Sequence, residues 1–89
     1  MNFEWDPRKA ARNERKHRVS FDEAMTVFAD WESVTIPDPD HSEDEERFLV
    51  VGVSLRGRML VVSHAERGEN TRIISARRAD ARERRKYGR

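Results

Sequence analysis

Seven basic side chains are concentrated in the stretch Thr71–Tyr87, where a short apolar strand is expected to lead through Ser75 into a helix. They are Arg72, Arg77, Arg78, Arg82, Arg84, Arg85 and Lys86. So many cations on one segment suit a polyanion, and nucleic acid is the first polyanion to consider. The alternative is a solvated helix stabilised by its own ion pairs, because Asp80 and Glu83 lie among the arginines.

Groups that could transfer protons stand close to these cations. His64 and Glu66 are two residues apart in an expected strand, so their side chains should share one face about 7 Å apart. RNA cleavage by attack of a 2′-hydroxyl on the neighbouring phosphate needs a base, an acid and cations around the developing charge. His64, Glu66 and Tyr87 could transfer protons, and Lys16 with His17 forms a second candidate pair.

Less specific readings of the same residues stay open. A single histidine on a strand hydrogen-bonds locally more often than it catalyses. His17, His41 and His64 show no spacing typical of metal ligands, so we expect neither a metal nor another cofactor.

The size and composition of the chain limit its class. Its 89 residues suit one domain, expected over 1–89, with a small core, because 36% of the residues are hydrophobic and 39% are charged. There is no cysteine, which rules out disulfides and thiolate zinc sites. We see neither a signal peptide nor a run of about 20 apolar residues, and therefore expect a cytoplasmic protein that does not enter membranes.

The net charge of +1 hides a strong separation of charge along the chain. Residues 30–46 include eight acidic residues and no lysine or arginine, whereas residues 56–89 include eleven basic and four acidic ones. Such a division suits an anionic substrate at one surface and a basic partner at another. A solvated acidic loop over 38–46 is an equally good reading.

The pattern of apolar residues predicts the order β-α-α-β-β-β-β-α. An edge strand at 2–5 precedes a helix that starts at Asp6-Pro7 and runs to about His17. A capping box of Ser20 and Glu23 opens the second helix. Strands are expected at 33–36, 47–55, 58–66 and from 71, before the basic helix. We predict an α+β fold: a small antiparallel sheet packed by two N-terminal helices, with a C-terminal basic helix.

Four stretches of the chain resemble one known family, the BrnT toxins of bacterial type II toxin–antitoxin systems. They are FEWDPRKAARNERKHRVSFDEA (3–24), EERF (45–48) followed by Gly52, ERG (66–68) and RIISARRADARERRKY (72–87). The resemblance extends over nearly the whole chain in order. Two positions differ from the usual pattern: Arg18 stands where glycine is usual, and His64 stands where an aromatic residue is also accepted.

The resemblance implies a RelE-like fold and a ribonuclease that arrests translation. It also implies neutralisation by a cognate ribbon-helix-helix antitoxin, with operator DNA bound only through the toxin–antitoxin complex. Residue chemistry and resemblance together give two candidate groups. The predicted catalytic residues are Glu66, Arg67, Arg77, Tyr87 and His64, with most weight on Arg67, Arg77 and Tyr87. The predicted RNA-binding residues are Lys16, His17, Arg47 and Arg72.

Two other functions remain open from the sequence. The chain could be a basic module that binds RNA or the ribosome without cutting it, or a corepressor that acts through its antitoxin. All of these predictions require that folding gathers the arginines of the late chain into one phosphate-sized pocket.

Overall fold

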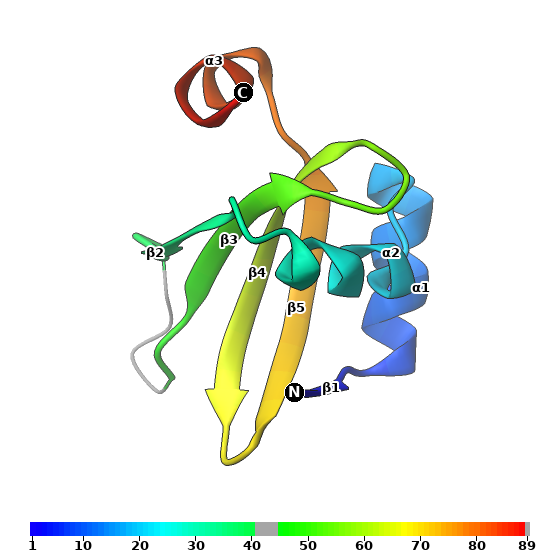
Figure 1. The fold of residues 1–89 in the computed structure, drawn as a ribbon. Coiled ribbons are helices and arrows are strands. Elements are labelled where there is room, and N and C mark those ends of the chain that lie inside the picture. Colours follow the sequence, from blue (N-terminus) through cyan, green and yellow to red (C-terminus); the bar gives the residue numbers. More distant parts are fainter. Residues whose placement is uncertain (41–44, 89) are drawn as a thin grey trace.

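The computed structural model describes residues 1–40 and 45–88 and confirms the predicted order of elements. The elements are β1 (Asn2–Glu4), α1 (Pro7–His17), α2 (Phe21–Thr26), the 3₁₀ turn η1 (Val27–Ala29), β2 (Val34–Pro37), β3 (Phe48–Val53), β4 (Met59–Arg67), β5 (Asn70–Arg78) and α3 (Ala81–Tyr87). The five strands form one sheet in the order β1-β5-β4-β3-β2 (Figure 1). His41 and the middle of the acidic loop lie outside the described residues.

The sheet is mixed, so the prediction of an antiparallel sheet is wrong at one edge. β1 runs parallel to β5, with Asn2 opposite Asn70, whereas the other three strand pairs are antiparallel. The short turns from β3 to β4 and from β4 to β5 force antiparallel pairing of these neighbours. β1 is separated from β5 by most of the chain and is free to pair in either direction.

Local capping explains where α1 and α2 begin and end. The Asp6 side chain accepts a hydrogen bond from the Arg8 amide at 2.8 Å, and α1 is closed after His17 by its C-cap Arg18, which has a left-handed φ of 59°. That conformation favours glycine, which fits the glycine usual at this position in the resembled family. Ser20 caps α2 through the Glu23 amide, as predicted.

The predicted reciprocal capping bond from Glu23 is not formed. The buried Glu23 carboxylate accepts hydrogen bonds from Ser54 at 2.7 Å and from the Arg58 guanidinium, and these, led by Arg58, lower its pKa. The ion pair between Glu23 and Arg58, two residues far apart in sequence, therefore connects α2 to the β3–β4 turn.

The boundary between the last strand and the last helix lies later than predicted. β5 continues to Arg78, because residues 76–78 pair with residues 60–62 of β4. α3 starts only at Ala81, where Asp80 and Glu83 form a capping box. Cross-strand pairing thus outcompetes the helix propensity of this segment.

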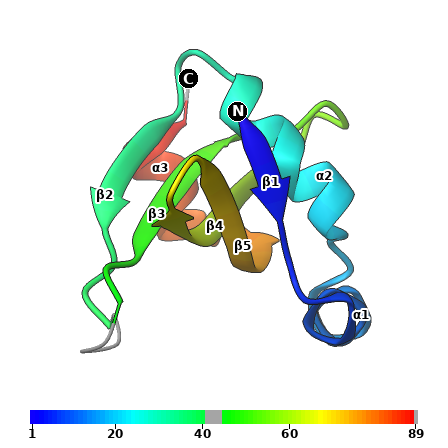
Figure 2. The same ribbon diagram turned by 90° about the horizontal axis from the view of Figure 1, so that it is seen from below.

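Two apolar clusters cover opposite faces of the sheet. On one face Val50, Leu60, Val62 and Ile73 pack against α2 and η1. On the other, Val51, Val61 and Ala79 pack with Tyr87 of α3. Figure 1 shows α2 in front of the strands and α3 beyond their upper end, and Figure 2 shows α1 next to the end of β1. Within the described part of the chain, no helix is long and apolar enough to cross a membrane.

Candidate functional site: a cationic pocket between α1 and β5

Asn13 holds α1 against the outer edge of β5. Its amide nitrogen donates hydrogen bonds to the carbonyls of Val19 and Ala76, at 2.9 and 2.8 Å, and its oxygen accepts one from the Ala76 amide at 3.1 Å. β1 pairs only with residues 70–72 of β5, so this side chain takes the place of a neighbouring strand at Ala76. The basic face of α1 is thereby fixed beside β5.

A β-bulge in β5 changes which side chains share a face. Ser75 pairs with Ser63 and Ile73 pairs with His64, which leaves Ile74 as an extra residue. In a regular strand Ile73, Ser75 and Arg77 would share one face, and the bulge separates Ile73 from the other two. With the bulge, Ser75 and Arg77 point to the α3 face of the sheet, whereas Ile73 points to the α2 face.

A pocket of about 460 Å³ opens on the α3 face between α1 and β5. We call it the cationic pocket, because no acidic residue is among its described lining residues. Its lining residues are Lys9, Arg12, Asn13, Lys16, His17, Arg47, Ile74 and Ser75. Three of the four predicted RNA-binding residues, Lys16, His17 and Arg47, therefore meet in one place.

Arg47 enters the cationic pocket from the start of β3 with part of its guanidinium unpartnered. Its Nε is buried and has no hydrogen-bond partner among the described residues. Among the described residues, the carboxylate that pairs with this nitrogen is that of Glu45, at 3.9 Å, which is beyond hydrogen-bonding distance. A buried donor without an acceptor is costly, so the charge of Arg47 is only weakly compensated within the described part of the protein.

The other predicted arginines are each paired with a carboxylate outside the cationic pocket. Arg72, the fourth predicted RNA-binding residue, lies 3.0 Å from Glu4, and Arg67 lies 3.1 Å from Glu45. Arg77 pairs with Val61 across the hairpin, six residues along β4 from Arg67, or about 20 Å at about 3.3 Å per residue. The sequence prediction that the late arginines form one pocket is therefore wrong, because they lie at opposite ends of one long hairpin.

Arg77 and Tyr87 are neighbours on the α3 face. Both guanidinium Nη atoms of Arg77 donate to the Glu83 carboxylate, at 2.8 and 2.9 Å, and Tyr87 packs beside Val61. The length of β5, which continues to Arg78, carries Arg77 to the start of α3, where it meets Glu83. Hydrogen bonds from Arg77, with a smaller contribution from the Asp80 amide, lower the pKa of Glu83 to about 2.

The low pKa of Glu83 predicts acid-dependent stability. Its folded pKa of about 2 lies below the usual 4.5, so its contribution is complete above about pH 4.5 and is lost as the pH falls towards 2. Because Arg77 is 41% exposed, we expect Glu83→Gln to lower the free energy of unfolding by only about 2 kcal/mol at pH 7. Urea unfolding at several pH values should show this difference shrinking below pH 4.5. Glu69→Gln, at an exposed turn, should show no such trend; a Glu83→Gln effect unchanged at pH 3 would contradict the assignment.

His64 and Glu66 share a face, as predicted, but lie away from the cationic pocket. His64 Nδ1 is 3.4 Å from Glu66 Oε2, and the imidazole ring packs against Phe28 of η1 and Phe48 of β3. Burial lowers the pKa of His64, and Glu66 opposes the shift. This pair lies on the α2 face, so the five predicted catalytic residues do not form one constellation.

Five lining residues of the cationic pocket were not predicted as site residues: Lys9, Arg12, Asn13, Ile74 and Ser75. Lys9, Arg12 and Lys16 follow one another at intervals of three and four residues, which places them on one face of a helix. That signal was present in the sequence, whereas the roles of Asn13 and Ser75 depend on tertiary contacts. In the described part of the chain, no group of three or more potential metal ligands lies together.

Comparisons with known proteins point to the same family as the resemblance seen in the sequence. The solved structure of the ribonuclease toxin BrnT from Brucella abortus matches with a TM-score of 0.66 and 22% sequence identity, covering 90% of this chain and 97% of that one. At this identity the match establishes the fold. No curated protein matches the chain. The family model described as "Ribonuclease toxin, BrnT, of type II toxin-antitoxin system" matches residues 5–83. The chain therefore belongs to the BrnT family of ribonuclease toxins from type II toxin–antitoxin systems.

Proposed function

We propose that the chain is a metal-independent endoribonuclease that binds the phosphates of RNA in the cationic pocket. The observation that carries this proposal is the gathering of four cationic side chains, those of Lys9, Arg12, Lys16 and Arg47, around one opening with His17. Guanidinium and ammonium groups can stabilise the charge that develops on a phosphate during cleavage without a metal ion.

His17 is the group in this pocket best suited to transfer a proton. It is half-buried at the last turn of α1, and an imidazole ring can both accept and donate a proton. In the proposed reaction it accepts the proton of the 2′-hydroxyl as that oxygen attacks the phosphorus. The bond from phosphorus to the 5′-oxygen then breaks, and that oxygen takes up a proton from water. The products are a 2′,3′-cyclic phosphate and a 5′-hydroxyl.

The residues favoured from the sequence take different places in this proposal. Arg77 follows Ser75 by two residues on the same face, about 7 Å further along β5, so Arg77 and Tyr87 could contact the RNA next to the pocket. Glu83 stays ionised at neutral pH because its pKa is about 2, which makes it a poor base. Arg67, Arg72, His64 and Glu66 lie outside the pocket, and we propose no role for them in the chemical step.

Membership of the family supports a cellular role for this activity. We propose that the toxin acts in the cytoplasm, where RNA cleavage inhibits translation, and that it is related to RelE in fold. A ribbon-helix-helix antitoxin would neutralise it, and the complex would bind operator DNA through the antitoxin. An alternative is a module that binds RNA or the ribosome without cutting it, or a corepressor acting through the antitoxin.

Cleavage of RNA in the presence of EDTA tests the proposal. The purified chain should cut single-stranded RNA at the same rate with EDTA and with added Mg²⁺, and the fragments should end in 2′,3′-cyclic phosphate. Its expression without a partner should stop growth. Fragments ending in 3′-hydroxyl, or cleavage only with Mg²⁺, would exclude this mechanism. RNA that is bound with strong salt dependence but stays intact would favour the non-catalytic module.

A further inference from the structure

A second pocket, of about 500 Å³, opens near the end of β4 and differs in chemistry from the cationic pocket. We call it the acidic pocket, and it is lined by Glu45, Glu46, Phe48 and Glu66. Glu45 is paired with Arg67, whereas Glu46 makes no ion pair with another described residue. The charged partner nearest Glu66 is His64, at 3.4 Å. Within the described part of the protein, two carboxylates of this pocket therefore lack a permanent cation.

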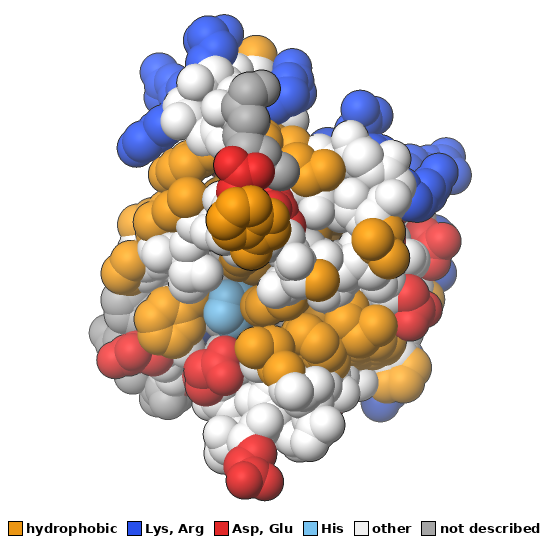
Figure 3. Space-filling model, in the orientation of Figure 1, with side chains coloured by type: hydrophobic (Ala, Val, Ile, Leu, Met, Phe, Trp, Pro, Cys, Tyr) orange, Lys and Arg blue, Asp and Glu red, His pale blue; other side chains and the backbone are white. Residues whose placement is uncertain are grey.

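A buried histidine with unpartnered nitrogens borders the acidic pocket. His64 is 5% exposed, and neither ring nitrogen has a hydrogen-bond partner among the described residues. Its ring lies against Phe48, at 5.9 Å between centroids, and its Nδ1 faces Glu66, so two of the four lining residues are its neighbours. Figure 3 shows a histidine at the bottom of a hollow on this face, between hydrophobic and acidic side chains.

The neutral form of His64 adds a hydrogen-bond acceptor to the acidic pocket. Burial lowers the pKa of this histidine, and a neutral imidazole has one nitrogen with a free lone pair. Buried polar atoms are almost always hydrogen-bonded in folded proteins. With Nδ1 directed at Glu66, the other ring nitrogen marks a place where a donor from a ligand would supply the missing hydrogen bond.

We propose that the acidic pocket binds an arginine side chain of a protein partner. A guanidinium group is planar, so it can donate to Glu46 and Glu66 and to His64 while one of its faces lies on the Phe48 ring. Lysine lacks the flat face and the fork of donors. Three glutamates repel the phosphates of RNA, so the charge of the pocket favours a basic protein segment over a nucleotide.

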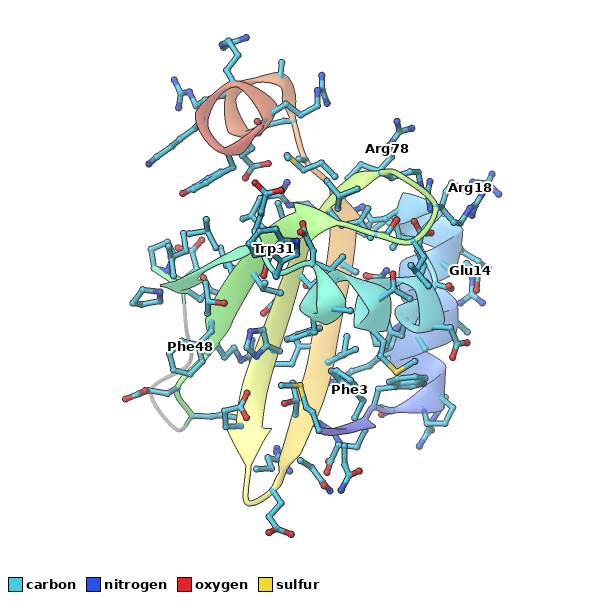
Figure 4. The ribbon with its side chains drawn as sticks, viewed as in Figure 1. Phe3, Glu14, Arg18, Trp31, Phe48 and Arg78 are labelled. Carbon is cyan, nitrogen blue, oxygen red and sulfur yellow. The ribbon has the colours of Figure 1, made fainter. Side chains whose placement is uncertain are left out.

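The acidic pocket and the cationic pocket open on different faces of the sheet, so a partner protein and RNA would bind to different surfaces. Phe48 and His64 lie on the α2 face of the sheet, whereas the cationic pocket opens on the α3 face. In Figure 4 Phe48 lies on the side of the sheet away from α1, which carries Glu14 and most of the cationic pocket. A partner that inserts an arginine into the acidic pocket would not cover the cationic pocket through this contact. The inference therefore goes beyond the proposed ribonuclease activity, and it can be wrong while that activity is right.

Titration with N-acetyl-arginine amide, followed by NMR, tests this proposal on the free protein. We expect saturable shifts of the His64 and Phe48 ring signals, with dissociation in the low millimolar range. N-acetyl-lysine amide should bind several-fold more weakly. Glu46→Gln and Glu66→Gln should each weaken arginine binding about 10-fold, since each removes a charge-assisted hydrogen bond.

Glu14→Gln is the matched control, because it removes the same charge from an exposed position on α1, and arginine binding should be unchanged. Thermal melts of all three variants separate loss of binding from loss of fold. Shifts spread over the whole surface, an equal response to glycinamide, or no saturation would overturn the proposal. Saturable binding of guanosine at His64 in place of arginine would overturn it too, and would identify the pocket as a site for an RNA base.

Discussion

Replacing Lys16 and Arg47 together by glutamine is expected to slow RNA cleavage at least about 100-fold while leaving the fold intact. Both side chains line the cationic pocket, from α1 and from the start of β3. Each charged hydrogen bond to the phosphate is worth about 1.5–3 kcal/mol, and about 1.4 kcal/mol changes a rate tenfold. Arg47 should contribute the larger part, because its buried Nε has no hydrogen-bond partner among the described residues.

The control removes the same number of charges from another basic surface. Arg82 and Arg85 are exposed on α3, so the Arg82→Gln/Arg85→Gln variant has the same net charge as the pocket variant. It should keep most of the activity and lose only the general attraction that high salt also removes. Cleavage rates of both variants at two salt concentrations, with thermal melts, make the comparison. Equal losses in the two variants would show that general charge, not the pocket, drives cleavage.

The elements of this fold could be predicted from the sequence because their signals are local. Asp6-Pro7 and Ser20 cap helices through amides only two or three residues away, and short turns dictate the hairpins. The direction of β1 could not be predicted, since it pairs with β5 across most of the chain. Neither could the end of β5, where pairing of residues 76–78 with β4 extends a strand into a segment that favours a helix.

The candidate site was predicted only in part, for the same physical reason. Lys16 and His17 were identified because they are adjacent in sequence, and Arg47 because of the family resemblance. One extra residue at the bulge, Ile74, changes the face to which every later side chain of β5 points. The error in grouping Arg67 with Arg77 arose because residues close in sequence can lie at opposite ends of a hairpin. Each of these arginines has a carboxylate partner that spacing could not reveal.

Asn13→Ala is expected to lower the free energy of unfolding by about 3 kcal/mol, a large fraction of the roughly 5–15 kcal/mol typical of small domains. Asn13 is 8% exposed and makes three hydrogen bonds to main-chain groups of Val19 and Ala76. Alanine would leave those groups without partners in a buried place, and each such loss costs about 1–3 kcal/mol. Urea unfolding measures the change, and faster hydrogen exchange at the Ala76 amide would locate it.

Asn13→Asp separates the accepted hydrogen bond from the two donated ones. A carboxylate can still accept from the Ala76 amide, but it cannot donate to the carbonyl of Val19 or Ala76. Its stability should lie at or below that of the alanine variant, since it also places a charge beside two carbonyl oxygens. Asn70→Ala is the matched control. Its side chain donates one hydrogen bond to the partly exposed Glu4, which water can replace, so the expected loss is below about 1 kcal/mol. A loss for Asn13→Ala no larger than for Asn70→Ala would mean that packing of α1, and not this amide, holds the wall of the cationic pocket against β5.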